Sequence, residues 1–150
     1  MNRERFSIII DSNEYSGGCA WTFPDYICHV KSLVKLGCDY SIRGHTGIIG
    51  VERKSFPDYV RCLGIGWKGF TKQLVKLSSK NRIYCVIVEG NLNDKIPIYS
   101  KMTQSAVIRQ TAKVVSYGIP VLFASSVDRA SSICTDFFIE ALKRIREGEI

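Results

Sequence analysis

The stretch that decides the fold is residues 37–58, which reads GCDYSIRGHTGIIGVERKSFPD. Residues 39–43 and 48–54 have the composition of strands and flank a glycine-rich turn, which predicts a β-hairpin. Ser55 predicts the start of a short helix that ends near Leu63, because a serine hydroxyl caps free helix amides and the Pro and Asp that follow suit a first turn. The stretch therefore predicts two antiparallel strands that lead directly into a helix.

The rest of the chain alternates between strand and helix patterns. The apolar run at residues 6–10 predicts a first strand, and the run at 83–88 predicts a strand buried on both faces because it does not alternate with polar residues. Helical spacing and capping residues predict further helices, and one more strand ends at Phe123; the helices cover residues 22–36, 70–77, 103–117 and 126–147. These elements predict an α/β fold with a mixed central β-sheet flanked by helices on both faces.

Length and composition limit the function classes. A chain of 150 residues, with 45% apolar and 23% charged residues, predicts one folded domain over 1–150. No apolar run approaches the ~20 residues that cross a bilayer, so we expect no membrane anchor or signal peptide. The excess of 21 Lys and Arg over 14 Asp and Glu favours a polyanion such as nucleic acid over a small-molecule substrate, with an ordinary basic surface as the alternative.

The six cysteines form no CxxC pair, and several lie in apolar runs, as buried free thiols do. This pattern predicts a reducing, intracellular compartment, the cytoplasm or the nucleus, for a protein of cellular or viral origin. The alternative is a zinc site, although its spacing matches no short ligand pattern. Its ligands would be Cys28, His29, Cys38 and His45.

The hairpin also brings chemically useful side chains together. Residues two apart on a strand face the same side, so Glu52 and Lys54 face together and Arg53 faces away. Asp39, at the start of the partner strand, is expected beside Glu52. Two close carboxylates repel unless a cation lies between them, and oxygen ligands suit Mg²⁺ or Mn²⁺. Such an ion activates water and orients a phosphodiester, and a lysine beside it stabilises the charge that develops on the phosphate.

These residues resemble a known family. Glu52-Arg53-Lys54, followed after three residues by Asp58 and preceded by Gly37 and Asp39, resembles the GD…ERKxxxD motif of XPF-type structure-specific nucleases, within the PD-(D/E)XK superfamily. IIIDSNE at 8–14 and VIVEG at 86–90 resemble that family's first strand with its DxRE segment and a later strand ending in glutamate. The resemblance implies a restriction-endonuclease-like core in a single nuclease domain, without a helix-hairpin-helix module in these residues.

The resemblance also assigns roles. It implies a Mg²⁺- or Mn²⁺-dependent endonuclease that hydrolyses DNA phosphodiester bonds at branched or single-strand/double-strand junctions. The implied catalytic residues are Asp39, Glu52, Lys54 and Asp58. The implied metal ligands are Asp39, Glu52, the Arg53 carbonyl and, at the edge of the site, Asp11. We expect DNA contacts from Asn13, which replaces the family's arginine, and from Arg53, Lys68 and Lys72. Cys38 is a further departure, because it separates a Gly-Asp pair that is adjacent in the family.

Plainer interpretations stand beside these. Each charged residue alone is typical of a solvated strand end or a helix cap, and Glu14 and Glu89 are weaker candidates. The segment 67–72 could fill the core or contact DNA. The final helix could fill the core or contact a second copy of the chain, since members of the family it resembles commonly form dimers. The alternative function is a non-catalytic DNA-binding or scaffolding subunit, which the intact acidic set disfavours and Asn13 weakly favours.

Overall fold

The computed structural model describes residues 5–150, which form a six-stranded sheet in the order β2-β1-β3-β4-β5-β6. Its strands are β1 (Ser7–Asp11), β2 (Ile27–Lys31), β3 (Tyr40–Ile42), β4 (Ile49–Ser55), β5 (Ile83–Glu89) and β6 (Val121–Ala124). Strand β3 runs antiparallel to both of its neighbours, whereas the β1–β2, β4–β5 and β5–β6 pairs are parallel. The expected mixed sheet is therefore confirmed.

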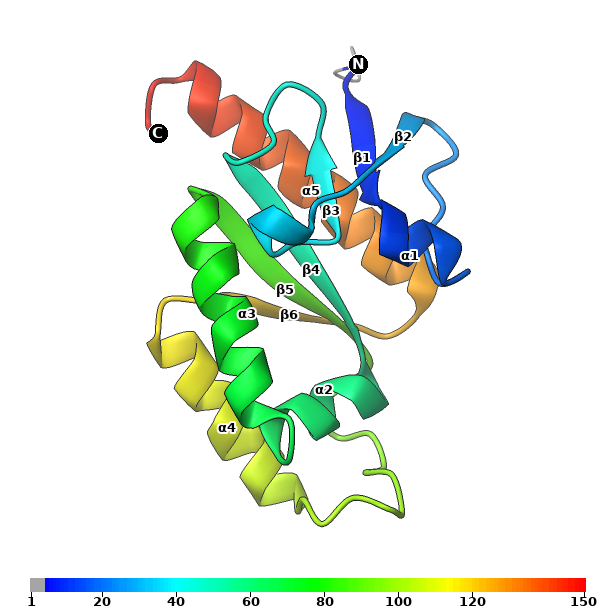
Figure 1. The fold of residues 1–150 in the computed structure, drawn as a ribbon, viewed down its shortest axis with the longest axis vertical. Coiled ribbons are helices and arrows are strands. Elements are labelled where there is room, and N and C mark those ends of the chain that lie inside the picture. Colours follow the sequence, from blue (N-terminus) through cyan, green and yellow to red (C-terminus); the bar gives the residue numbers. More distant parts are fainter. Residues whose placement is uncertain (1–4) are drawn as a thin grey trace.

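Helices cover both faces of this sheet (Figure 1). They are α1 (Ser12–Ser16), the 3-10 turn η1 (Val34–Leu36), α2 (Phe56–Leu63), α3 (Trp67–Lys80), α4 (Gln104–Ser116) and α5 (Val127–Arg146). The last helix packs on one face, and α2, α3 and α4 pack on the other. No described helix is long and apolar enough to cross a membrane.

The strand periodicity divides the apolar side chains between two cores. In β1, Ile8 and Ile10 face the α5 side and Ile9 faces the opposite side. The same alternation in β5 sends Cys85 toward α5 and Val86 toward the α2–α4 layer, and both are fully buried. Both faces of β5 are covered, and the strand carries no charged residue until Glu89. This is the burial that its unbroken apolar run predicts.

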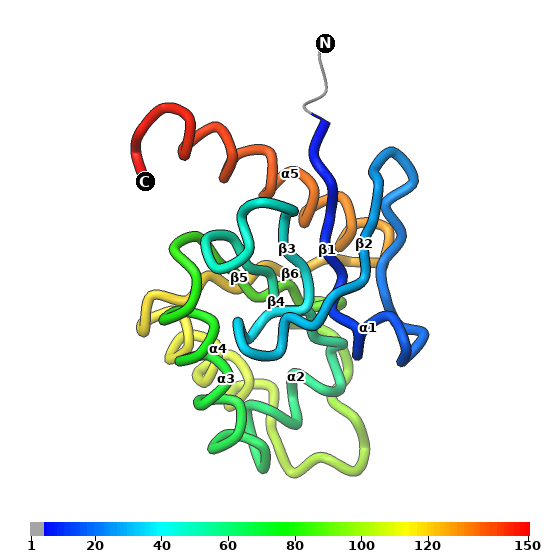
Figure 2. Tube along the Cα trace, turned by 45° about the horizontal axis from the view of Figure 1, so that its top comes forward, coloured from blue at the N-terminus to red at the C-terminus, as the bar shows by residue number. Residues whose placement is uncertain are grey.

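The helix predicted over residues 22–36 is wrong. The segment instead returns along the side of the sheet to β2, which pairs in parallel with β1 (Figure 2). The apolar residues that suggested a helix do not share one buried face, since Ile27 is 68% and Val34 is 49% exposed while Leu33 is buried. The buried anchors are Trp21 and Phe23, which join the α5-side core, and Leu33, which joins the opposite core. Ladder hydrogen bonds to β1 and these three anchors therefore outweigh the helical spacing.

The hairpin that leads to the site forms as predicted, with Tyr40 opposite Val51. Gly37 precedes it with φ 66°, and a Cβ there would lie 2.8 Å from the Leu77 backbone nitrogen, so this turn needs glycine. The additional residue, Cys38, is accommodated in the core, where it is 4% exposed.

The cysteines behave as free thiols. Those at 38, 62, 85 and 134 are buried and those at 19 and 28 are exposed. Burial raises the pKa of the Cys85 thiol to about 12, as expected of an inert core residue. Within residues 5–150, no three or more His, Cys, Asp or Glu side chains gather into a metal cluster, so the zinc alternative is wrong.

Candidate active site

Two carboxylates from adjacent strands lie at the centre of the site. Because Tyr40 pairs with Val51, the residue before Tyr40 falls next to the one after Val51, and these are Asp39 and Glu52. Asp39 accepts a 2.8 Å hydrogen bond from the backbone amide of Arg53. Glu52 is 2% exposed, which is exceptional for a charged residue. The hairpin register therefore creates the pair that the sequence predicted.

Both acids have raised pKa values, for different reasons. Burial, followed by the charge of Glu14, raises the pKa of Asp39 from 3.8 to about 7. Burial, followed by the charge of Asp39, raises the pKa of Glu52 well above its usual range. A buried and a half-buried carboxylate carry two negative charges against the single ammonium of Lys54, so at neutral pH the pair favours a further bound cation or a shared proton.

Gln73 holds one oxygen of Glu52 and leaves the other free. The amide Nε2 of Gln73, on α3, donates a 2.6 Å hydrogen bond to Glu52 Oε1. The second oxygen, Glu52 Oε2, is buried and has no hydrogen-bond partner. Buried acceptors are nearly always satisfied, so an orphaned carboxylate oxygen beside a second carboxylate is suited to receive a ligand.

Lys54 lies on the same side of β4 as Glu52, as the strand period predicts. Its ammonium is 3.4 Å from Glu52 Oε1 and 3.4 Å from Asp58 Oδ2, and it lies 5.6 Å from the centre of the Phe70 ring. Burial alone would lower the pKa of Lys54, but the carboxylates around it, Glu52 above all, raise it. The lysine is therefore a fixed cation, and Asp58, which also pairs with Arg61, anchors it from the first turn of α2.

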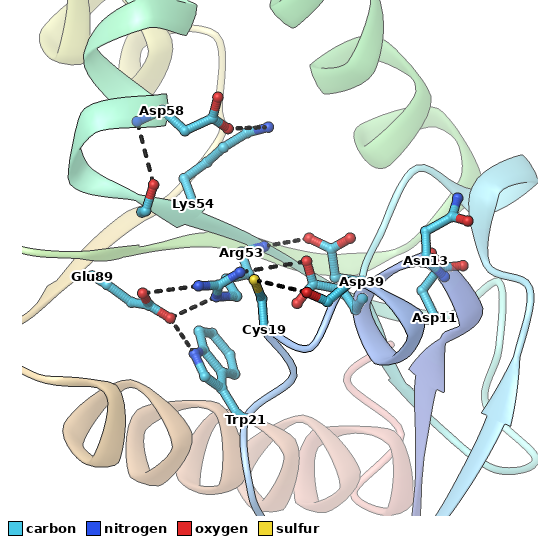
Figure 3. A network of polar contacts seen from close by, with 12 residues as sticks. Asp11, Asn13, Cys19, Trp21, Asp39, Arg53, Lys54, Asp58 and Glu89 are labelled. Carbon is cyan, nitrogen blue, oxygen red and sulfur yellow. Dashed lines mark hydrogen bonds and ion pairs between the residues drawn. The ribbon is translucent and has the colours of Figure 1, made fainter.

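Arg53 points to the opposite side of β4, also as predicted (Figure 3). Its guanidinium donates to both oxygens of Glu89, at 2.6 and 3.0 Å, and lies 3.6 Å from Glu14. Trp21 donates to the same Glu89, and Arg53 and Trp21 hold the pKa of Glu89 below its usual range. Glu89 is therefore not a free strand end in solvent; with Glu14 it holds the Arg53 side chain in place.

Asp11 and Asn13 stand at the other edge of the site. Asp11 accepts hydrogen bonds from the backbone amides of Asn13 and Leu33, at 3.1 and 2.6 Å, so it joins β1 to α1 and to the segment before η1. Its carboxylate is 3% exposed. Both residues line the cleft that opens over Asp39 and Glu52.

That cleft has a volume of about 350 Å³, and its wall away from the hairpin is α3. The helix contributes Gly69, Lys72, Gln73 and Lys76 to the lining. Lys72 therefore lies at the site, whereas Lys68 lies beside a separate shallow hollow with Trp67. Phe70 fills the core and Trp67 is half-buried, so the aromatic residues of segment 67–72 serve mainly in packing. A larger hollow of about 990 Å³ at the far end of the sheet contains none of the predicted site residues.

Three features of the site carried no signal in the sequence. Gln73 and Lys76 lie 21 and 24 residues beyond Glu52, so no local spacing connects them to it. Trp21 reaches Glu89 only because the segment before β2 crosses the sheet edge.

The final helix contributes Phe138 and Leu142 to the core, which is one of the two roles that its apolar residues predicted.

No protein-family profile matches the chain, and no curated protein matches it in sequence. Solved structures do match. XPF from Aeropyrum pernix superposes with a TM-score of 0.69 at 18% identity, over 90% of this chain and 61% of that one. The same protein in complex with DNA gives 0.70 at 19% identity, over 93% and 66%. The chain thus spans less than two thirds of the length of these proteins. With the mixed sheet and its helices, the superpositions show that this chain has an XPF-like nuclease fold.

Proposed function

We propose that this protein is a metal-dependent DNA endonuclease that hydrolyses phosphodiester bonds. The observation that carries the proposal is the adjacent pair of carboxylates, the half-buried Asp39 and the buried Glu52, with the ammonium of Lys54 3.4 Å from Glu52. A purely structural acid pair would be costly, because each buried charge loses its hydration. Perturbed acids beside a fixed cation in a cleft are typical of a catalytic site.

The donor set fits Mg²⁺ or Mn²⁺. Glu52 Oε2 is buried and unpartnered, and Asp39 and Glu52 have pKa values that a nearby cation would return toward normal. The Arg53 carbonyl is the proposed third ligand. Asp11 is proposed only at the edge of the site, because the backbone amides of Asn13 and Leu33 hold both of its oxygens and, within residues 5–150, it forms no cluster of three acids with Asp39 and Glu52. One or two carboxylates with water and substrate oxygens are the usual Mg²⁺ environment. When bound, the ion supplies an activated water and neutralises charge on the phosphate.

The chain's own residues then have defined roles. Lys54 lies where it can orient the attacking water or stabilise the negative charge of the attacked phosphate. Asp58 fixes the lysine through the 3.4 Å ion pair and does not itself need to contact the substrate. Gln73 holds Glu52 in one rotamer. Arg53 is held on the far side of β4, so its side chain supports the strand that carries the site.

The expected substrate is DNA with a branch or a single-strand/double-strand junction. One XPF structure that superposes on this chain is a DNA complex, which supports DNA as a ligand here. Asn13 and Lys72 line the cleft and are the proposed backbone contacts, with Lys68 farther along α3. The charge of +7 favours such contacts. The junction preference rests on the resemblance in the hairpin motif.

A homodimer is part of the proposal on the same resemblance. The final helix, which the sequence offered as a dimer surface, places Phe138 and Leu142 in the core, so the dimer proposal rests on the resemblance alone. We expect light scattering at micromolar concentration to give twice the chain mass of 16.9 kDa. A single-chain mass at all concentrations would remove the dimer and leave the nuclease proposal intact.

Cleavage of a labelled branched DNA tests the proposal. We expect the wild type to cut with Mg²⁺ and not with EDTA, and Glu52→Gln to abolish cutting while DNA binding persists. Glu140→Gln is the matched control, because Glu140 is an exposed acid on α5 that forms an ion pair with Lys143, away from the site. DNA binding by the wild type without cutting would support the scaffolding alternative instead. Cutting by Glu52→Gln at the control's rate would refute the site.

A further inference from the structure

A row of lysines on α3 extends from the candidate active site toward the far end of the molecule. Lys68, Lys72, Lys76 and Lys80 are spaced four residues apart, so they follow one face of the helix, and all four are exposed. Lys68 lies beside the separate hollow with Trp67. We call the three from the cleft onward, Lys72, Lys76 and Lys80, the lysine stripe. Helix α3 contains no acidic residue. Figure 1 shows α3 in green, lying along the sheet.

The stripe has no structural explanation within the described chain. None of its lysines forms an ion pair among the salt bridges of residues 5–150. Like charges four apart destabilise a helix by about 0.2–0.5 kcal/mol per pair, so the row opposes the stability of α3. By contrast, the exposed lysine of α5, Lys143, lies 2.6 Å from Glu140. An unneutralised row of this kind is suited to a polyanion outside the molecule.

The stripe begins inside the cleft. Lys72 and Lys76 line the same hollow as Asp39 and Glu52, and the hydrogen bond from Gln73 fixes the helix against the carboxylate pair. Lys80 ends the helix one turn beyond Lys76. A chain of phosphates that enters the cleft can therefore continue along α3 without leaving the positive charge.

One glycine of α3 leaves room beside this path. Gly69 lines the cleft, and a Cβ placed there would meet nothing within 4 Å. Glycine inside a helix costs about 1 kcal/mol relative to alanine, and no packing contact explains it here. A missing side chain on the cleft side lets a ligand backbone approach the helix closely.

We propose that the DNA strand leaving the carboxylate pair runs along α3 toward Lys80, with its phosphates on the lysine stripe. The inference rests on the proposed nuclease function and adds the direction of the DNA. From Gln73 to Lys80 the helix rises about 10 Å at ~1.5 Å per residue. At ~3.4 Å per phosphate along a duplex strand, this length accommodates about three phosphates on that side of the cut.

The test measures DNA affinity against salt concentration by fluorescence anisotropy in EDTA, which prevents cleavage. The double substitution Lys76→Ala/Lys80→Ala should lower the slope of log affinity against log salt by about 1.8, because each phosphate contact contributes about 0.9. At 0.15 M salt this corresponds to roughly a five-fold loss of affinity for each lysine. The matched control, Lys143→Ala on α5, should leave the slope unchanged.

Truncated DNA then locates the strand. Using the cleavage site mapped with Mg²⁺, the DNA is shortened from one end or the other until a single phosphate remains beyond the cut. Shortening on the stripe side should abolish the difference between the double variant and wild type, and shortening on the other side should preserve it. Gly69→Leu should weaken DNA binding without lowering the melting temperature. The control Ser132→Leu, at an exposed position of α5 on the other face of the sheet, should leave DNA binding unchanged.

The outcomes separate the two proposals. If wild type binds and cuts DNA but the double variant has the wild-type salt slope, the stripe is not the DNA path and the nuclease function stands. The path is equally refuted if the loss of affinity persists after either end is shortened. If wild type binds no DNA, the proposed function itself fails.

Discussion

The acid pair should reveal itself through stability before any activity is measured. Asp39→Asn replaces a half-buried carboxylate by a neutral amide of nearly the same shape, whose oxygen can still accept the hydrogen bond from the Arg53 amide. In the metal-free protein we expect this substitution to stabilise the fold at pH 8. The same substitution should remove a proposed metal ligand, so stability and metal binding should change in opposite directions.

The magnitude follows from the pKa of Asp39. A rise from 3.8 to about 7 sets an upper limit of about 4 kcal/mol, at ~1.36 kcal/mol per unit. Because Asp39 is half-buried and its hydrogen bond with Glu52 offsets part of the cost of burial and of the Glu14 charge, the expected gain is about 1–3 kcal/mol. The folded pKa lies above the unfolded one, so the cost is absent well below pH 3.8, where both states hold the proton, and is still small near pH 4. It grows as the pH rises toward 7 and is constant above that.

Urea unfolding in EDTA at pH 4 and pH 8 measures this difference. We expect the variant to match wild type near pH 4 and to exceed it at pH 8. Added Mg²⁺ should stabilise wild type at pH 8 and not the variant, since a ligand that binds only the folded state stabilises it. Equal effects of the substitution at both pH values, or a loss of stability at pH 8, would refute the assignment of Asp39 to a strained acid pair.

Further predictions concern single side chains. Lys54→Ala should lose most of the single-turnover cleavage rate with DNA affinity retained, and Lys54→Arg should restore the rate only in part; a wild-type rate for the alanine variant would make the lysine structural. Gln73→Met should weaken Mg²⁺ binding about ten-fold, because Glu52 loses the hydrogen bond that positions it. Isothermal titration of Mg²⁺ into the protein measures this change in affinity. Tyr59→Phe should cost about 1 kcal/mol of unfolding free energy by removing a buried 2.8 Å hydrogen bond, whereas Tyr84→Phe, with an exposed 3.4 Å bond, should be neutral in the same denaturation assay.

Local rules determined much of this protein. The hairpin, the Ser55 cap and the apolar strand β5 follow from short-range spacing, because strand alternation and helix capping depend only on neighbouring residues. The same alternation separated Lys54 from Arg53 correctly. The acid pair was also predictable, since a hairpin fixes which residues of its two strands are opposite.

Tertiary structure decided what neighbouring residues do not specify. Residues 22–36 have helical spacing, yet residues 27–31 of this segment form strand β2, because the free edge of β1 offers them ladder hydrogen bonds. Gln73 reaches Glu52 only after α3 packs across the sheet, and Glu89 meets Arg53 only through the parallel β4–β5 pairing. Contacts between residues far apart in the chain depend on how whole elements pack, and the free energy of that packing outweighs local preference wherever the two disagree.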